Sequence, residues 1–257
     1  MLFLLSPAKT LNFETAAPCK ARSMPPFVSE SAELINVLKT KSVADIAALM
    51  ALSDTLAALN VGRYGVWSPG FTARNSKAAL FAFNGDVYDG LNAPTLSQAD
   101  VLWAHQHVAI LSGLYGVLRP LDRMQPYRLE MGTALPNSRG KNLYAFWGDT
   151  IALHLNERVK TDASPVIVNL ASLEYFKAAD RKALKPRVIE CVFEDWKTDR
   201  FKVISFFAKR ARGLMARFAI TQRLTLPEGL KKFDAEGYTY TPEASEPDRW
   251  VFRRRVA

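Results

Sequence analysis

Polar side chains follow two apolar runs of the sequence, Met1–Leu5 and Val166–Ser172, whose unbroken apolar character is typical of buried strands. In sheets flanked by helices, ligands bind outside the carboxyl ends of the strands, so side chains placed there could hold a substrate or act as nucleophile, acid or base. The candidate catalytic residues at the two strand ends are Ser6, Lys9, Asn169, Ser172 and Glu174. Spacing alone supports no particular mechanism; a simple turn at Lys9 and a helix-surface pair of Glu174 with Lys177 are the alternatives.

A second kind of candidate is cationic. The stretch Leu111–Met131 contains Gly113 and Gly116, which allow a positive φ or a close approach of another backbone, and two prolines, which interrupt any regular helix or inner strand. Its cations are Arg119, Arg123 and Arg128. An ordered loop that carries cations and aromatic rings is costly to build for packing alone, which favours a binding role. The alternative is a surface loop whose arginines pair with Asp122 and Glu130, because such ion pairs are common and weak.

The segment Ala208–Phe218 has the periodicity of an amphipathic helix with a core seam on one side and cations on the other. Its candidate anion-binding residues are Lys209, Arg210 and Arg212. Gly213 in the middle of this helix costs roughly 1 kcal/mol relative to Ala, which predicts a close approach by another backbone. A solvated basic face is the alternative, but no acidic residue lies between Arg200 and Glu228 to neutralise these cations.

The basic excess of the chain is concentrated in its last quarter. The formal net charge is +9, and the segment Lys197–Ala257 has 14 Lys and Arg against 7 Asp and Glu, whereas the remainder has 20 against 18. This asymmetry indicates a polyanionic partner, with nucleic acid as the expected one. A positive charge that serves only solubility is the alternative, and charge by itself does not separate the two.

Several familiar chemistries have no signature in the sequence. There is no P-loop, no G-x-G-x-x-G fingerprint and no G-x-S-x-G elbow, and the Cys and His residues do not have zinc-ligand spacing. Asp86 and Asp89 could hold a metal, but Asn-Gly and Asp-Gly in Phe83–Leu91 favour an ordinary turn. We therefore expect no cofactor and no metal site, although carboxylates could still hold iron.

The composition indicates a globular chain of mixed α/β class, and we expect a single compact domain over residues 1–257 with a mixed sheet and surrounding helices. Cys19 and Cys191 form no C-x-x-C pair, which favours a reduced, cytoplasmic setting. The apolar runs are too short for a membrane span, and the first residues lack a signal-peptide pattern. The sequence does not determine the oligomeric state, and a monomer is slightly favoured.

The secondary structure can be read from capping and periodicity. Helices are expected over Ala73–Phe81 and Ser97–Ile110, the second with Ser97 and Asp100 as its capping box. Two β-branched and aromatic runs, Arg187–Asp195 and Arg200–Phe207, predict a hairpin.

Six blocks of the sequence are long and rare in composition: SPAKT, FNGDVYDGL, LSGLYGVLRPLDRMQPYRLEM, LYAFWGD, VNLASLEYFK and ISFFAKRARGLMARF. In this order, and over nearly the whole chain, they resemble the YaaA family of bacterial peroxide-stress proteins. The resemblance implies a cytoplasmic protein of the oxidative-stress response that limits iron-driven damage. It also implies an unusual single-domain α/β fold and binding of duplex DNA in a basic cleft through a helix-hairpin-helix-like element.

In this sequence the expected carrier of that element is the pair of segments flanking Ser112–Gly116. The fit is imperfect, because the usual hairpin spaces its glycines two apart whereas Gly113 and Gly116 are three apart, and Pro120 interrupts the second segment. The expected nucleic-acid-binding residues are Lys9, Gly113, Gly116, Arg119, Arg123, Arg128, Lys209, Arg210 and Arg212. Contacts of backbone and cations with phosphates position DNA without reading its sequence. The competing hypothesis is an enzyme that acts on a nucleotide, a damaged nucleic acid or a small metabolite in a polar pocket at the strand ends.

Overall fold

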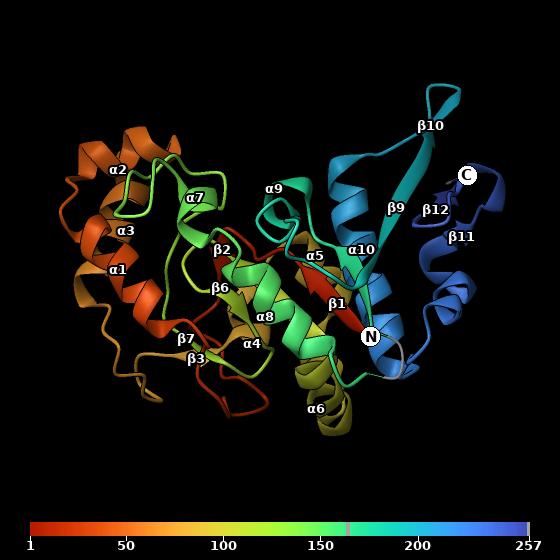
Figure 1. Cartoon of the computed structure of the whole chain (residues 1–257), viewed down its shortest axis with the longest axis horizontal. Coiled ribbons are helices and arrows are strands. Elements are labelled where there is room, and N and C mark those ends of the chain that lie inside the picture. The colour runs from red at the N-terminus through yellow and green to blue at the C-terminus, as the bar shows by residue number, and fades with distance from the viewer. Residues whose placement is uncertain (163–164, 256–257) are drawn as a thin grey trace.

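The computed structural model describes residues 1–162 and 165–255, and it contains a mixed sheet in the order β11-β12-β9-β8-β1-β5-β6, with β10 added to β9 (Figure 1). These strands are β1 (Leu2–Leu5), β5 (Val108–Ser112), β6 (Gly116–Leu118), β8 (Val166–Leu170), β9 (Arg187–Lys197), β10 (Arg200–Lys202), β11 (Thr239–Tyr240) and β12 (Arg249–Arg254). The expected mixed α/β class is confirmed.

The middle of the sheet is parallel and its margins are antiparallel. β12, β9, β8, β1 and β5 run in one direction, while β11, β10 and β6 pair antiparallel with their neighbours. After β1 the chain adds β5 on one side of it, and it returns later to add β8 on the other side. The strand order therefore reverses between β1 and β8, which is where open α/β sheets form a ligand-binding crevice.

Helices and short strand pairs surround the sheet (Figure 1). The α-helices are α1 (Val28–Lys39), α2 (Val43–Met50), α3 (Asp54–Val66), α4 (Ala79–Ala82), α5 (Asp86–Leu91), α6 (Gln98–His107), α7 (Leu143–Trp147), α8 (Thr150–Val159), α9 (Leu173–Phe176) and α10 (Ser205–Thr221). The short strands are β2 (Thr10–Leu11) with β4 (Phe83–Asn84), and β3 (Lys77–Ala78) with β7 (Arg123–Met124). Short 3₁₀ helices cover Ala93–Thr95, Pro227–Lys232, Ala235–Gly237 and Pro242–Ala244.

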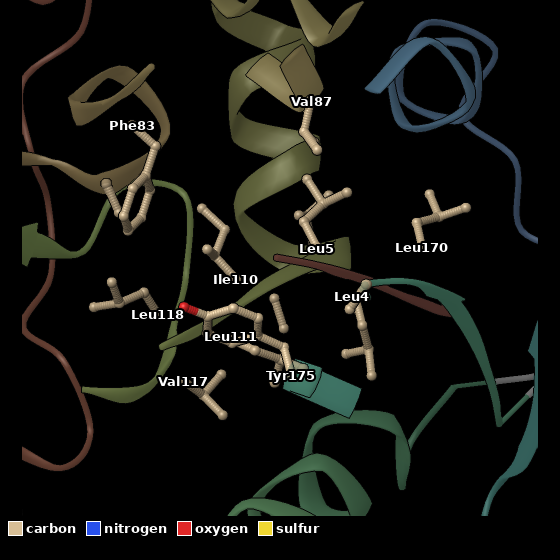
Figure 2. Packing of buried hydrophobic residues seen from close by; sticks show 14 of the residues in the cluster. Leu4, Leu5, Phe83, Val87, Ile110, Leu111, Val117, Leu118, Leu170 and Tyr175 are labelled. Atoms are coloured by element: carbon tan, nitrogen blue, oxygen red, sulfur yellow. The ribbon is translucent and has the colours of Figure 1, made fainter. Parts of the chain in front are cut away.

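The core lies where the parallel strands meet. In register, Leu5 of β1 faces Ile110 of β5 on one side and Leu170 of β8 on the other, and all three side chains are fully buried (Figure 2). Strands buried on both faces carry continuous apolar runs rather than alternating ones. This is why Met1–Leu5 and Val166–Ser172 could be recognised as strands from the sequence.

The expected helix-hairpin-helix at Ser112–Gly116 is wrong. β5 and β6 flank this turn as antiparallel strands, with Ser112 opposite Gly116. Gly113 and Gly116 are buried, and a Cβ at these positions would lie 2.3 Å from the Leu129 carbonyl oxygen and 2.8 Å from the Trp147 ring. Their backbone is thus packed in the core, not presented to a phosphate. The apolar run that forms β5 is compatible with either a buried strand or a helix. It is a strand because it pairs with β1.

Three further expectations need correction, and two are confirmed. The helix expected to reach Ile110 ends at His107, the helix expected over Ala73–Phe81 is replaced by β3 and α4, and the turn expected at Phe83–Leu91 is helix α5. Ser97 does cap α6, because its hydroxyl accepts a hydrogen bond from the Asp100 backbone N–H. The hairpin of β9 and β10 is confirmed, although β10 ends at Lys202 and the chain enters α10 at Ser205.

The close approach predicted at Gly213 is confirmed. A Cβ at Gly213 of α10 would lie 1.8 Å from the carbonyl oxygen of Val87, and one at Gly90 of α5 would lie 2.2 Å from the carbonyl oxygen of Arg210. Such distances are far below any real contact, so glycine is required on both helices. The crossing holds α10 against the segment Asp86–Leu91 and fixes the position of the cations that α10 carries.

Candidate functional site

The parallel pairing of β1 and β8 brings the two predicted groups of polar residues together. Ser6 and Ser172 follow the paired ends of these strands, and the backbone N–H of Ser172 donates to the Ser6 hydroxyl over 2.8 Å. The two hydroxyl oxygens lie 3.3 Å apart. No sequence pattern predicted this adjacency, because residues 166 positions apart meet only through the sheet.

A cavity of about 490 Å³ opens at these strand ends, and we call it the strand-end pocket. Its hydroxyl-bearing and charged lining residues are Ser6, Lys9, Thr10, Asp86, Tyr88, Glu130, Ser172, Glu174, Tyr175, Lys209 and Arg212. A volume of this size suits a small molecule, since ligand pockets range over about 300–1,000 Å³. Four of the five candidate catalytic residues therefore line one cavity, together with two further candidate nucleic-acid-binding residues, Lys209 and Arg212.

Arg212 of α10 is the cation in this pocket that lacks a partner. It is half-buried, and its guanidinium makes no hydrogen bond or ion pair with any residue in the part of the chain that the structure describes. Burial lowers the pKa of Arg212, and the nearby Glu190 carboxylate partly opposes this effect. A guanidinium that is partly withdrawn from water and has no acceptor among the described residues is only incompletely solvated, and an anion in the pocket would supply acceptors in the planar geometry that arginine prefers.

The other two cations of the strand-end pocket have carboxylate partners. The Lys209 ammonium lies 3.9 Å from Asp86, at the limit of an ion pair. The Lys9 ammonium lies 3.1 Å from Glu130, and the same carboxylate oxygen accepts from Arg128 over 3.1 Å. Lys209 is about half exposed, so its weak pair with Asp86 leaves it able to turn towards a ligand.

The two remaining candidate catalytic residues differ in position. Glu174 lines the pocket, and one of its carboxylate oxygens accepts the Gly132 backbone N–H over 2.9 Å, which leaves the other free of any described hydrogen bond. Asn169 lies inside β8, is buried, and accepts the Ala171 backbone N–H over 3.0 Å. Asn169 is therefore not among the residues that line the pocket, and it stabilises the turn that follows β8.

Two tyrosines line the pocket in addition to the predicted candidate residues. The Tyr88 hydroxyl donates to the backbone carbonyl of Ser6 over 3.0 Å, and Tyr175 also lines the pocket. Burial raises the pKa of both well above the usual value, so both hydroxyls stay protonated near neutral pH. Tyr88 is part of the segment interpreted as a turn, and only its helical structure in α5 directs this side chain to the pocket.

The cations expected to form one cleft are distributed over several places. Arg119 pairs with the fully buried Asp122 at 3.0 Å, and Arg210 pairs with Glu236. Arg123 lines a different cavity and donates to the Ser76 hydroxyl over 3.4 Å. The alternative interpretation of the Leu111–Met131 arginines, in which they pair with Asp122 and Glu130, thus describes Arg119 and Arg128.

The fold and the pocket define an α/β protein with a polar, mixed-charge ligand cavity at the point where the order of its parallel strands reverses. Comparison with known proteins then identifies the family. Residues 1–244 match the family model described as peroxide stress protein YaaA, and the chain belongs to this family.

Close relatives cover the chain from end to end. It is 65% identical over 254 residues to a UPF0246 protein of Polaromonas naphthalenivorans, covering 99% of this chain and 98% of the relative. It is 62% identical over 258 residues to a UPF0246 protein of Paracidovorax citrulli, covering all of both chains. These similarities confirm the resemblance stated from the sequence blocks.

Among residues 1–162 and 165–255, no individual helix has the length and apolar character needed to cross a bilayer; α2 and α3 together meet those criteria, but the chain bends by 111° between them. Within the same residues no three or more His, Cys, Asp and Glu side chains are grouped as metal ligands.

Proposed function

We propose that this chain serves the peroxide-stress response as an enzyme that binds a small anionic molecule, of the size of a nucleotide or a metabolite, in the strand-end pocket. The observation that carries the proposal is Arg212, whose guanidinium has no partner among the described residues and faces a cavity shared with Ser6, Ser172 and Glu174. Lys209 and Lys9 add positive charge, and the free oxygen of Glu174 offers a proton acceptor. We place the protein in the cytoplasm, as its two unpaired cysteines suggest.

Support for a chemical step comes from the charges of the pocket. A pocket that only holds an anion needs cations, whereas this one also has carboxylates at Glu174 and Glu130. A general base must lie within hydrogen-bond reach of the proton it removes, and Glu174 lies on the wall of the cavity. The Ser6 hydroxyl has no basic side chain as a hydrogen-bond partner among the described residues, so Glu174 is the stronger candidate for proton transfer.

The binding part of the proposal is tested with Arg212→Gln. A panel of nucleotides and anionic metabolites is screened by the rise in unfolding temperature, and hits are titrated calorimetrically. We expect a hit whose affinity falls about 10- to 100-fold in Arg212→Gln, because a charge-assisted, bidentate contact is lost. Arg200→Gln removes the same charge from an exposed position on β10 and should leave the affinity unchanged. Equal binding by wild type and Arg212→Gln would remove the basis of the proposal.

The chemical part is tested with Glu174→Gln. This variant should bind the same ligand but fail to restore peroxide resistance to a strain that lacks the protein. If it protects as well as wild type, Glu174 has no catalytic role and the pocket only binds.

A second candidate function, supported by the net charge of +9 and by the family resemblance, is binding of duplex DNA without sequence specificity. A role in limiting iron-driven damage belongs to this candidate and has the resemblance as its support. Arg119 is about one-third exposed, so Arg119→Ala should weaken all duplexes alike and reduce the salt slope by about one unit. An unchanged slope would exclude Arg119 as a phosphate contact, and Arg187→Gln, at an exposed cation elsewhere, is the matched control.

A further inference from the structure

A second cavity, of about 580 Å³, lies between the segment Phe13–Ala21 and the strand pair β3–β7, and we call it the basic pocket. Its charged lining residues are Glu14, Lys20, Arg74, Lys77 and Arg123, and Cys19 also lies in its wall. Pairing of β3 with β7 places Ala78 opposite Arg123, which brings Arg123 beside Lys77. Of these cations, only Arg123 is among the binding residues predicted from the sequence.

The charges of the basic pocket are almost all of one sign. Four cations and a single carboxylate face the cavity, and none of the four has an ion-pair partner within the described ranges 1–162 and 165–255. The Lys77 ammonium is held by the carbonyl oxygens of Asn12, at 2.8 Å, and Thr15, at 2.7 Å. Burial lowers the pKa of Lys77, so the protein retains this charge against a desolvation cost.

We propose that the basic pocket binds a compact phosphorylated anion of the diphosphate class. Like charges around one cavity repel each other unless an anion separates them, and the surplus of cations over Glu14 exceeds what one carboxylate could neutralise. A phosphoryl group carries up to about two negative charges, and arginine forks such as those of Arg74 and Arg123 match its oxygens bidentately. Phe13, Ala17 and Ala21 form an apolar part of the wall beside the cations, where an organic group attached to the diphosphate would fit.

The site is distinct from the strand-end pocket and independent of the function proposed for it. The residues lining the two cavities do not overlap. Arg212 contributes to one and Arg123 to the other, so substitutions separate their ligands.

The two cysteines of the chain allow the ligand to be located. Cys19 lies half-buried in the wall of the basic pocket, whereas Cys191 is buried in β9, where burial raises the pKa of its thiol. A neutral alkylating reagent should therefore modify Cys19 first, because the thiolate is the reactive form and Cys191 has neither access nor ionisation. Mass spectrometry of peptides measures the two rates separately.

The experiment titrates inorganic pyrophosphate into the full chain by calorimetry and follows Cys19 alkylation in parallel, with sodium chloride at matched ionic strength as the control. We expect 1:1 binding in the micromolar to low millimolar range and at least about fivefold slower alkylation of Cys19, since contacts with two arginine forks and two ammonium groups are lost only on dissociation. The variant Arg74→Gln/Arg123→Gln should lose both effects, and Arg212→Gln should keep both.

Three outcomes would overturn the proposal: no heat and no protection with pyrophosphate, protection that sodium chloride reproduces, or protection that survives in Arg74→Gln/Arg123→Gln. Binding that is lost in Arg212→Gln but kept in the double variant would also overturn it, and would assign the ligand to the strand-end pocket. A second titration with ADP distinguishes the source of the diphosphate, because a nucleotide that uses the apolar wall should bind more tightly than pyrophosphate.

Discussion

The strand-end pocket and the basic pocket differ in the signs of their charges and in the secondary structure that positions their residues. In the strand-end pocket, Lys9, Lys209 and Arg212 share the cavity with Asp86, Glu130 and Glu174. In the basic pocket, four cations face one carboxylate. A cavity with several groups of both signs can bind an anion and move a proton within it, whereas a cavity in which cations outnumber the one carboxylate, Glu14, is better suited to holding an anion.

The elements behind the two pockets also differ. The strand-end pocket is built on two parallel strands of the central sheet and on α10, a helix of 17 residues locked against α5. The basic pocket is built on a strand pair of two residues per strand and on the irregular segment Phe13–Ala21. Sites on regular elements are held more accurately than sites on loops, so we expect the strand-end pocket to be the more selective of the two.

The largest effect on stability should come from Gly213→Val. This substitution disturbs the crossing of α5 and α10 behind the strand-end pocket and does not touch the basic pocket. A side chain at this position meets the Val87 carbonyl at a distance that no relaxation of a side chain can relieve. We expect a loss of about 3 kcal/mol or more in the free energy of unfolding, because overpacking against backbone forces the helices apart. Urea unfolding measures this loss, and whatever fraction folds should lose the ligand of the strand-end pocket but keep the protection of Cys19.

A matched control for that substitution lies in α3. Gly65→Ala places a methyl group where nothing lies within 4 Å. Because Ala is favoured over Gly in a helix, this variant should be more stable by about 0.5–1 kcal/mol. If Gly213→Val were as stable as wild type, the crossing of α5 and α10 would not be the constraint that positions Arg212.

An effect of intermediate size on the free energy of unfolding should come from lowering the pH, through a histidine that lies outside both pockets. Burial, with the charges of Arg158 and Arg119 adding to it, lowers the pKa of His154 from 6.5 to about 4. The unfolded chain therefore binds the proton more tightly than the folded protein, and stability should fall as the pH decreases from about 6.5 to 4. The loss in the free energy of unfolding over this pH range should be about 2 kcal/mol, once screening by solvent is taken into account. Urea unfolding across this range should show a smaller pH dependence in His154→Gln, and an unchanged dependence would show that His154 is not responsible.

The smallest effect on stability should come from Lys209→Gln. Lys209 is half exposed and 3.9 Å from Asp86, so its loss should change the free energy of unfolding by less than about 0.5 kcal/mol. The affinity of the strand-end pocket for its anion should nevertheless fall severalfold, with no change in Cys19 protection by pyrophosphate. Calorimetry on both ligands measures the contrast, and a parallel loss at both pockets would mean that they share one binding surface.

Parts of the strand-end pocket could be predicted because its residues follow recognisable strands. Ser6 and Ser172 come after apolar runs that form β1 and β8, and Gly213 required a close backbone neighbour, which α5 provides. The helix-hairpin-helix at Ser112–Gly116 was wrong because the apolar run before it fits a helix or a strand equally well, and only pairing with β1 decides. The basic pocket was missed because Cys19 and Lys20 lie in an aperiodic segment and Lys77 in a segment with a helical pattern.

The sequence by itself determined which segments form buried strands, where capped helices begin, and that the chain carries a surplus of cations towards its end. The tertiary structure alone decided which cations are neutralised. Arg119, Arg128 and Arg210 form ion pairs with carboxylates, whereas Arg212 forms none with the described residues. The physical reason is that periodicity and capping are local and act within a few residues, while the interaction of two charges depends on their distance in space and on their shared exposure to water. Both of these are set by how the strands and helices pack.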